Sequence, residues 1–263
     1  MKYYSPLTKY NGFTLIEMSI VLVIIGLIVG GILTGKSLIR SADLNQMVVE
    51  LKGYEIAVTQ FDDKYGHLPG DIPNAMSFWP SCIAVDPGHA SNTCNGNGNR
   101  MIEVPNREIL RAWQHLSFAG LVPGQYTGLE FSGTGAWERG VNVVAGGIKN
   151  TVIFVGHWHP VGAQYSFDRT HNYISVGKLV PNIMGGGVSA GGAFLTPEEA
   201  YIIDTKFDDG VADSGSLHTF FGTNDSGSCL KNVSGSLPYI TAGEYDLLDK
   251  TVSCRIHWVM RHW

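Results

Sequence analysis

Residues 12–33 read GFTLIEMSIVLVIIGLIVGGIL and decide how the chain is organised. The 21 residues from Phe13 to Leu33 contain one ionised side chain, that of Glu17. At about 1.5 Å per residue, a helix of this length covers the roughly 30 Å hydrocarbon core of a bilayer. The stretch therefore predicts a transmembrane helix over 13–33.

Glu17 is the anomaly in this helix. An ionised carboxylate near a bilayer centre costs at least about 2.5 to 3.5 kcal/mol, so an unpaired one is expected only where something uses it. Phe13 lies one helical turn before Glu17, on the same face. Cleavage between Gly12 and Phe13 would create an ammonium group at Phe13, which could pair with a carboxylate of its own chain or of a neighbouring copy.

These residues resemble a known family. A short polar leader, Gly12, Phe13 and then TLIEMSIVLVIIGLI are similar to the processing site of type IV prepilins and of the pseudopilins of type II secretion. The resemblance implies cleavage after Gly12 by a prepilin peptidase, N-methylation of Phe13, and a helix that packs beside others in a filament, with Glu17 as the assembly carboxylate. Many members carry a proline further along the helix. Here that region reads GGILTGKS, so any local melting would fall to its glycines.

A secretory signal peptide and an ordinary signal anchor account less well for the apolar run. A signal peptide has an apolar core of about 7 to 15 residues and a small-residue cleavage site, whereas this run is longer and lacks an A-x-A end. A signal anchor accounts for the length, but neither for Glu17 nor for the junction of Gly12 with Phe13.

The orientation of the helix follows from the resemblance alone, because basic residues flank the run on both sides (Lys2, Lys9, Lys36 and Arg40). The implied location is the inner membrane, crossed once, with a periplasmic head. Assembly would then move the chain into a periplasmic pseudopilus or a cell-surface pilus.

The sequence after the membrane run predicts that the helix continues. From Ser41 the apolar residues recur at three- and four-residue steps, which predicts an amphipathic helix. This stripe consists of Leu44, Met47, Val48, Leu51, Tyr54, Val58, Phe61 and Tyr65. The glycines and prolines of YGHLPGDIP, residues 65–73, end it. We therefore expect a leader over 1–12, one helix over 13–65 and a globular head over 66–263.

Composition is typical of an exported, loop-rich head. The net charge of −5 gives no basic footprint, so nucleic-acid binding is not predicted. The four cysteines lie after the membrane run and none forms a C-x-x-C motif, which favours two disulfides with three possible pairings. Proximity in sequence favours Cys82 with Cys94 and Cys229 with Cys254.

The head combines short strands with two short helices. ILRAWQHLSFAGLV predicts a helix that stops at Gly120. LTPEEAYIID predicts a second, capped by Thr196 with Glu199 three residues on. Strands are expected at VNVVA, TVIFVGHW, AQYSF, YISVGKLV and SCRIHWVM. The predicted class is α+β, a pilin-like fold in which a long N-terminal helix packs on a small antiparallel sheet with loop insertions.

The most ligand-like cluster is DTKFDDGVADSG, residues 204–215. Asp204, Asp208, Asp209 and Asp213 surround Gly210 and offer hard oxygen ligands of the kind that Ca²⁺ takes in flexible loops. Some pseudopilins bind Ca²⁺ in a C-terminal loop, so the resemblance adds support. The spacing is not that of an EF-hand, and the competing interpretation is a helix end whose turns are closed by Asp side chains. No other cofactor is predicted.

CNGNGNRMIE, residues 94–103, spaces three asparagines and an acid like the front of a calcium loop (Asn95, Asn97, Asn99 and Glu103). The stretch carries almost no charge to hold an ion, which favours a turn bounded by a disulfide.

GHWHP places His157 and His159 two residues apart on a strand, with His171 close behind. Three histidines can hold a catalytic Zn²⁺, but such a pair on a strand more often faces solvent. Trp79, Trp137, Trp158, Trp258 and Trp263 could line a surface for sugars or a partner, yet most tryptophans in a head of this size are expected in the core.

The sequence predicts a structural, non-enzymatic subunit of a type IV pilus or a type II secretion pseudopilus. The resemblance implies as partners other pilin or pseudopilin subunits, prepilin peptidase and an inner-membrane assembly platform powered by a cytoplasmic ATPase. The alternative is a membrane-anchored periplasmic metal-dependent enzyme that uses the histidine strand or the aspartate loop.

Overall fold

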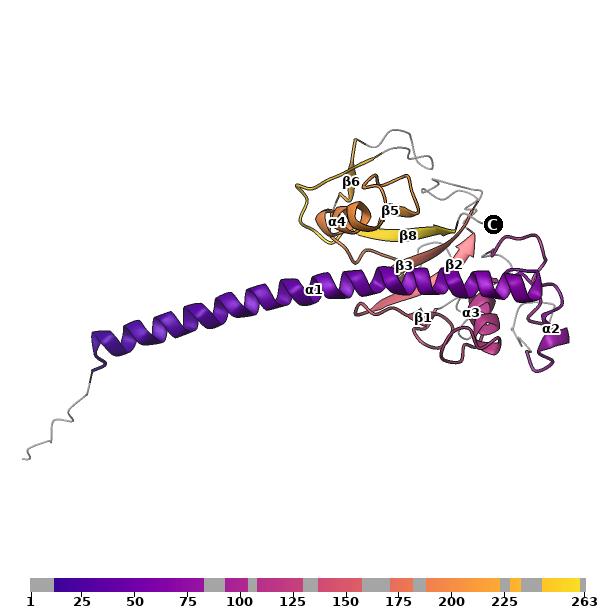
Figure 1. Cartoon of the computed structure of the whole chain (residues 1–263), viewed down its shortest axis with the longest axis horizontal. Coiled ribbons are helices and arrows are strands. Elements are labelled where there is room, and N and C mark those ends of the chain that lie inside the picture. Colours follow the sequence, from indigo (N-terminus) through magenta and orange to yellow (C-terminus); the bar gives the residue numbers. More distant parts are fainter. Residues whose placement is uncertain are drawn as a thin grey trace, which may run out of the picture. The chain divides into compact units, whose positions relative to one another are not determined.

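The computed structural model describes residues 12–82, 93–103, 108–129, 137–157, 171–181, 188–222, 228–232 and 243–260. They belong to two compact units, Met1–Asp43 and Leu44–Trp263. The second unit is an α+β head in which helices accompany an antiparallel sheet (Figure 1). The boundary between the two units falls within the first helix, so the second half of that helix belongs to the head.

Helix α1 spans Leu15–Tyr65 and confirms the predicted long N-terminal helix. Its buried residues all lie in the second half and belong to the predicted stripe or flank it: Leu44, Met47, Val48, Leu51, Ala57, Val58 and Phe61. The helix ends where Gly66 adopts a positive φ of 71° and donates its N–H to the carbonyl oxygen of Asp62 at 2.7 Å. Glycine reaches this left-handed conformation without a Cβ penalty, so the chain can turn there.

The remaining helices are α2 (Ala75–Phe78), α3 (Glu108–Phe118) and α4 (Pro197–Phe207). The strands are β1 (Val144–Ala145), β2 (Thr151–His157), β3 (Asn172–Pro181), β4 (Val188–Gly192), β5 (Leu217–Phe221), β6 (Leu230–Lys231), β7 (Glu244–Tyr245) and β8 (Cys254–Met260). Helices α3 and α4 and strands β2, β3 and β8 confirm the predicted elements, whereas β1 keeps only the end of VNVVA. The expected strand AQYSF lies outside the described residues.

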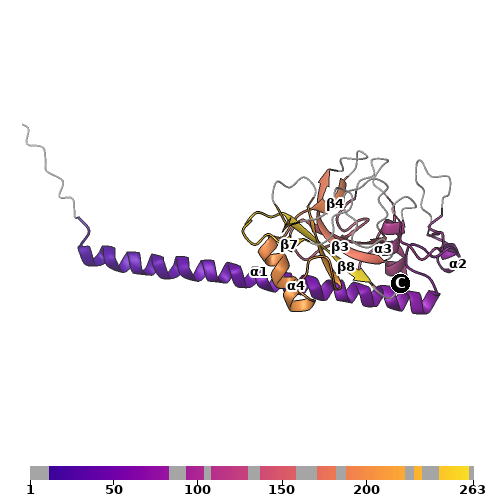
Figure 2. The same cartoon turned by 90° about the horizontal axis from the view of Figure 1, so that it is seen from above.

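The main sheet is antiparallel, with the order β1, β2, β3, β8, β5 and with β4 pairing on β3. Strands β6 and β7 form a separate two-stranded sheet. The last strand, β8, therefore lies between β3 and the edge strand β5 (Figure 1). Figure 2 shows β8 beside β3 from above. Every residue of β2 and β8 is buried, as expected for strands covered on both faces.

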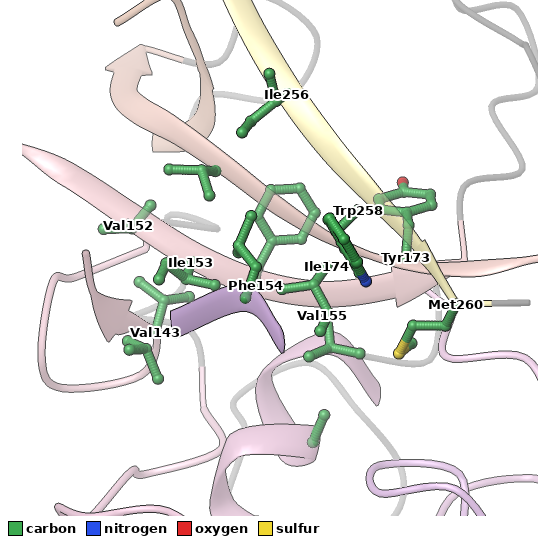
Figure 3. Close-up of a cluster of buried hydrophobic side chains, with 14 of the residues drawn as sticks. Val143, Val152, Ile153, Phe154, Val155, Tyr173, Ile174, Ile256, Trp258 and Met260 are labelled. Carbon is green, nitrogen blue, oxygen red and sulfur yellow. The ribbon is translucent and has the colours of Figure 1, made fainter. Parts of the chain in front are cut away.

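The second half of α1 packs on this sheet through β8. Figure 3 shows the apolar cluster in which Ile174, Trp258 and Met260 meet side chains from β2. The indole Nε1–H of Trp258 donates to Glu55 Oε2 of α1 at 2.8 Å. The ammonium of Lys52, also on α1, lies 5.2 Å from the centroid of the Trp258 ring. Half of α1 is thus part of the core of the head.

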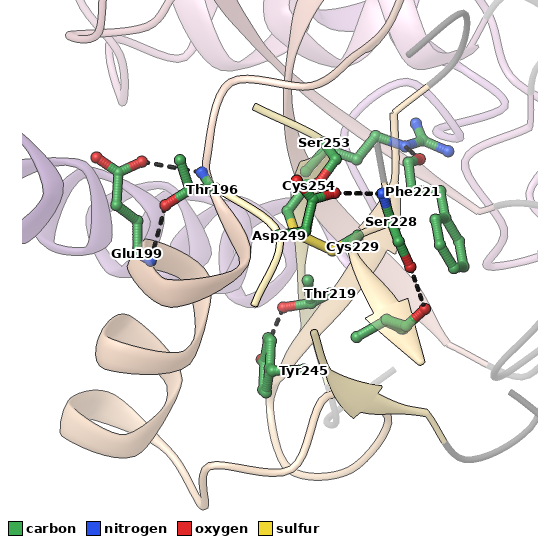
Figure 4. Close-up of a disulfide and its surroundings, with 12 residues drawn as sticks. Thr196, Glu199, Thr219, Phe221, Ser228, Cys229, Tyr245, Asp249, Ser253 and Cys254 are labelled. Carbon is green, nitrogen blue, oxygen red and sulfur yellow. Dashed lines mark hydrogen bonds between the residues drawn. A yellow bond between two sulfur atoms is a disulfide. The ribbon is translucent and has the colours of Figure 1, made fainter. Parts of the chain in front are cut away.

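Two disulfides link the pairs that proximity favours. Cys82 is bonded to Cys94, 12 residues later, and Cys229 to Cys254, 25 residues later. The second bond joins the residue before β6 to the start of β8, close to the Thr196 cap of α4 (Figure 4). All four cysteines are fully buried.

Candidate functional site

The first candidate site is the start of α1. Thr14 immediately precedes the helix, and its backbone N–H donates to Glu17 Oε2 at 2.8 Å. The Thr14 hydroxyl donates to the same oxygen at 2.7 Å and accepts the backbone N–H of Glu17 at 3.3 Å. This is a reciprocal capping box, in which two donors of the first helical turn find acceptors.

The capping box changes the view of Glu17 as a charge near the bilayer centre. Glu17 is the third residue of α1, so its carboxylate reaches back to the helix start. There it lies at the positive end of the helix dipole, where negative charge is stabilised. The free-energy cost quoted for an ionised carboxylate at the bilayer centre therefore overestimates the cost for Glu17, which lies at the helix start and accepts hydrogen bonds there.

Side chains from Leu15 to Ile39 leave an apolar surface uncovered. None of these residues is buried, and Glu17 and Lys36 are the charged residues among them. Among the described residues, α1 is the helix with the length and composition to cross a membrane. Core helices of soluble proteins pass the same test when they are buried, but the apolar window of α1 has no buried residue. Large uncovered apolar surface indicates contact with lipid or with other protein.

Comparison with known proteins identifies this segment. A family model described as the prokaryotic N-terminal methylation motif matches residues 7–33. The chain carries the prepilin-type cleavage and methylation motif. The match confirms the resemblance, and Gly12, Phe13 and Glu17 all fall within it, although residues 7–11 lie outside the described part of the structure.

No curated protein and no solved structure matches the chain. The prepilin motif covers about a tenth of the sequence, so the head must be interpreted from its own residues.

The acidic turn after α4 brings together three of its four predicted ligands. Carboxylate oxygens of Asp204, Asp208 and Asp209 lie within 4.8 Å of one another, and Asp213 is not part of this group. Burial raises the pKa of Asp204 to about 6, and Tyr245 donates its hydroxyl to Asp204 Oδ2 at 2.5 Å.

Hydrogen bonds within the head occupy most of these oxygens. Asp208 Oδ2 accepts the N–H groups of Ser216 and Leu217 at 2.6 and 2.8 Å. Asp204 Oδ1 accepts the N–H of Gly210, and both oxygens of Asp209 accept hydrogen bonds from the same turn. Five of the six oxygens thus already have donors, which fits a turn closed by Asp side chains better than an ion site. The geometry thus favours the turn interpretation over the calcium site, which stays an untested prediction.

The three histidines of the predicted zinc site are not all described. His157 ends β2 and lies opposite Asn172 in the register with β3. It is 2% exposed, so the expectation of a solvent-facing side chain is wrong for this residue, because β2 is covered on both faces. His171 is half-buried, and His159 lies outside the described residues. The zinc site and the metal-dependent enzyme stay predictions.

The asparagine loop that follows the first disulfide is built on buried carboxylates, which no sequence pattern indicated. Asp71 is fully buried, and its carboxylate accepts the N–H groups of Gly98 at 2.7 Å, Asn99 at 3.1 Å and Arg100 at 2.7 Å. A Cβ atom at Gly96 would stand 2.3 Å from the Cα of Asp71. The glycines of CNGNGNR therefore let the backbone wrap closely around this carboxylate.

Glu108, at the start of α3, is the second buried carboxylate under this loop. Its oxygens accept the N–H groups of Asn97 at 3.0 Å and Glu103 at 2.8 Å. Burial nevertheless raises the pKa of Glu108 to about 7, because these hydrogen bonds do not offset the loss of hydration. Asn97 and Asn99 donate their side-chain amides to Glu103 Oε2, each at 3.0 Å. The segment thus forms a turn bounded by a disulfide, as its low charge favoured.

His115 joins the loop to the connector after α1. Its Nδ1 accepts the N–H of Gly70 at 2.9 Å, and its Nε2 lies 3.1 Å from the carbonyl oxygen of Cys94, which fixes the proton on Nε2. Burial lowers the pKa of His115 to about 3, so the ring is neutral at physiological pH. Its proximity to Cys82 and Cys94 is not a metal site, because both sulfurs are in the disulfide. No spacing in the sequence links His115 to Gly70, 45 residues earlier.

The described tryptophans lie in the core or pack against it. Trp258 is buried, and Trp79 and Trp137 are partly buried against the core, whereas Trp158 and Trp263 lie outside the described residues. Trp113, fully buried on α3, meets Tyr54 of α1 edge to face with ring centroids 5.1 Å apart. The expectation of a core position is thus confirmed for Trp258, whereas Trp79 and Trp137 pack against the core without being buried in it.

Proposed function

We propose that this chain is a structural subunit of a type IV pilus or a type II secretion pseudopilus. In this proposal prepilin peptidase cleaves it between Gly12 and Phe13, Phe13 is N-methylated, and the mature chain polymerises through α1. The prepilin motif at residues 7–33 is the observation that carries the proposal.

The surface of α1 supports a mechanism based on interaction. Apolar side chains from Leu15 to Ile39 have no cover within the described part of the chain, so they need lipid before assembly and neighbouring helices after it. Exchange of lipid burial for helix burial lets an inner-membrane platform move the subunit into a filament without exposing this surface to water. The head would then lie in the periplasm or on the cell surface, where its two disulfides are stable.

Processing is tested by mass spectrometry of the chain from its native host. We expect a mature chain that begins at Phe13 and carries one methyl group on its amine. Gly12→Leu should leave the precursor uncut, while Gly26→Leu, a matched change within the helix, should be cut normally. A mature chain that begins elsewhere, or still at Met1, would overturn the proposal.

The charge of Glu17 is tested separately. In the proposal its carboxylate pairs with the ammonium of Phe13 in another subunit. We expect Glu17→Ala and Glu17→Gln to insert into the membrane and be cleaved, but not to form filaments. Glutamine still accepts hydrogen bonds from a capping residue, so its failure would separate charge from capping. Normal filaments from Glu17→Gln would contradict the pairing.

The system that the subunit serves is decided by a deletion strain. Loss of surface filaments with normal export would assign the chain to a type IV pilus. Accumulation of exported proteins in the periplasm, with surface filaments intact, would assign it to type II secretion.

A further inference from the structure

One buried carboxylate holds the asparagine loop at two points. Glu108 is fully buried, and its Oε1 accepts the backbone N–H of Asn97 at 3.0 Å while its Oε2 accepts the backbone N–H of Glu103 at 2.8 Å. The two donors are six residues apart in the chain. Both bonds need an oxygen that accepts, and a carboxylate offers two such oxygens only in its ionised form.

Protonation of Glu108 would remove one of these acceptors. The protonated acid carries an O–H donor on one oxygen, and that donor would face the N–H group that the oxygen accepted before. One of the two bonds to the loop must then open. We expect it to be the bond from Asn97, because this bond is the longer one and Asn97 is exposed, so water can replace the lost acceptor.

The surroundings of Glu108 favour the proton, whereas its two hydrogen bonds favour the charge. The charged groups that act on it in the described part of the head are Asp71 and Glu103, both acidic, and burial raises its pKa to about 7. The other titratable side chains of the neighbouring elements are Arg111 and the neutral His115 on α3, the ion pair of Asp62 with Arg100, and His67 in the connector after α1. Glu108 is therefore placed between two states of similar free energy.

Asp71 holds the middle of the same loop with more donors. Its carboxylate accepts the backbone N–H groups of Gly98, Asn99 and Arg100. Burial raises the pKa of Asp71, but these three hydrogen bonds act against the shift. Three donors on a side chain that is intrinsically more acidic than glutamate preserve the charge to lower pH. These three amides are thus an internal reference for the two amides that Glu108 holds.

We propose that Glu108 is a proton-dependent clamp of the asparagine loop. In its ionised form it holds the loop at Asn97 and Glu103, and in its protonated form it releases Asn97. Asp71 keeps the middle of the loop in place in both states. The clamp changes the order of an exposed surface of the head without unfolding the head, and it depends on neither processing nor assembly.

The test is hydrogen exchange of the full chain in detergent, followed by mass spectrometry with residue resolution. Protection is the ratio of the intrinsic to the observed exchange rate, so the direct effect of pH on exchange cancels. We expect the protection of the Asn97 amide to fall roughly thirtyfold from about pH 8.5 to about pH 5.5, as the protonated fraction of Glu108 rises. The amides of Gly98 and Arg100 should change by less than about threefold, because Asp71 still holds them.

Two variants separate the clamp from its surroundings. Glu108→Gln carries one acceptor oxygen and one donor group, like the protonated acid, so we expect low protection of Asn97 at both pH values. Glu103→Gln removes an acidic neighbour that raises the pKa of Glu108. In this variant the fall in protection should keep its size and move to lower pH.

Equal protection of Asn97 at both pH values in the wild type would overturn the proposal, as would a fall that persists in Glu108→Gln. An equal fall at Gly98 and Arg100 would also overturn it, because the loop would then open as a whole and not at the clamp. If Glu108→Gln does not fold, Glu103→Gln decides. A midpoint that stays in place or rises in that variant would assign the proton to another group.

Discussion

The two halves of α1 belong to one continuous helix but differ in composition and in burial. From Leu15 to Ile39 no side chain is buried, whereas between Leu44 and Phe61 seven are. The first half is apolar on all faces, and the second has one apolar stripe with charges around it. A helix that is apolar all round needs an apolar environment on every side, while a single stripe needs only one sheet. The difference separates the apolar segment that carries the prepilin motif from the segment that belongs to the core of the head.

The largest expected effect concerns two adjacent valines in the second half of α1. Val48 is fully buried and Val49 is 58% exposed. We expect Val48→Asp to prevent folding of the head, because an unpaired buried charge costs a large part of the stability of a domain. Val49→Asp should change the unfolding free energy by less than about 0.5 kcal/mol. Thermal unfolding of both variants in detergent checks this, and equal midpoints would contradict the packing of α1 on the head.

Two isoleucines, one in each half of α1, test whether the first half lies in lipid and the second does not. Ile24 and Ile56 are 50% and 57% exposed, so exposure alone does not distinguish them. We expect Ile24→Asp to make membrane insertion less favourable by about 3 kcal/mol, the difference between these side chains at a helix centre. Ile56→Asp should insert like the wild type. Alkaline extraction of membranes measures the retained fraction, and equal retention of both variants would place the span elsewhere.

The second half of α1 belongs to the head, and two disulfides cross-link the rest of it. Their contributions to the unfolding free energy of the head can be compared. Loop-closure entropy favours the Cys229–Cys254 bond, which closes the longer loop, over Cys82–Cys94 by about 0.6 kcal/mol. We expect the double change to serine at Cys229 and Cys254 to lower the unfolding free energy more than the same change at Cys82 and Cys94. Denaturant unfolding of both variants gives the order. The reverse order would show that the asparagine loop stabilises the head more than its short span suggests.

The pH dependence of the head has a defined sign. Burial raises the pKa of Glu108 to about 7, so the folded state keeps a proton that the unfolded state loses above its pKa of about 4.5. The unfolding free energy should therefore fall as pH rises from about 4.5 to 7, and Asp204, with its pKa raised to about 6, acts in the same direction. Glu108→Gln should flatten this slope while lowering stability throughout. An undiminished slope in Glu108→Gln would assign the effect to other groups, whereas a reduced slope is expected to remain because of Asp204.

The smallest expected effect is that of calcium on the melting temperature of the head. Because five of the six oxygens in the acidic turn already accept hydrogen bonds, we expect millimolar Ca²⁺ to leave the melting temperature unchanged. Magnesium at equal ionic strength is the control. A rise with calcium that Asp209→Asn abolishes would establish the calcium site instead.

Local patterns were enough for elements with a strong repeat or a cap. The stripe from Leu44 predicted which side of α1 is buried, and Thr196 with Glu199 predicted the start of α4 together with its capping box. Strand β5 was missed because LHTFF, residues 217–221, is short and mixes polar with apolar residues. Its stability depends on pairing with β8, which lies more than 30 residues further along the chain.

The sequence by itself determined the membrane run, the prepilin motif, the long helix and the favoured partners of the cysteines, because these depend on composition, spacing and short-range order. Only the tertiary structure set Asp71, Glu108 and His115 under the asparagine loop, whereas the capping box of Thr14 and Glu17 is local, because its residues are three positions apart. Hydrogen bonds of the loop join residues as many as 45 positions apart. Such contacts leave no periodic trace in a sequence, since buried polar groups pair with whatever backbone the fold brings to them.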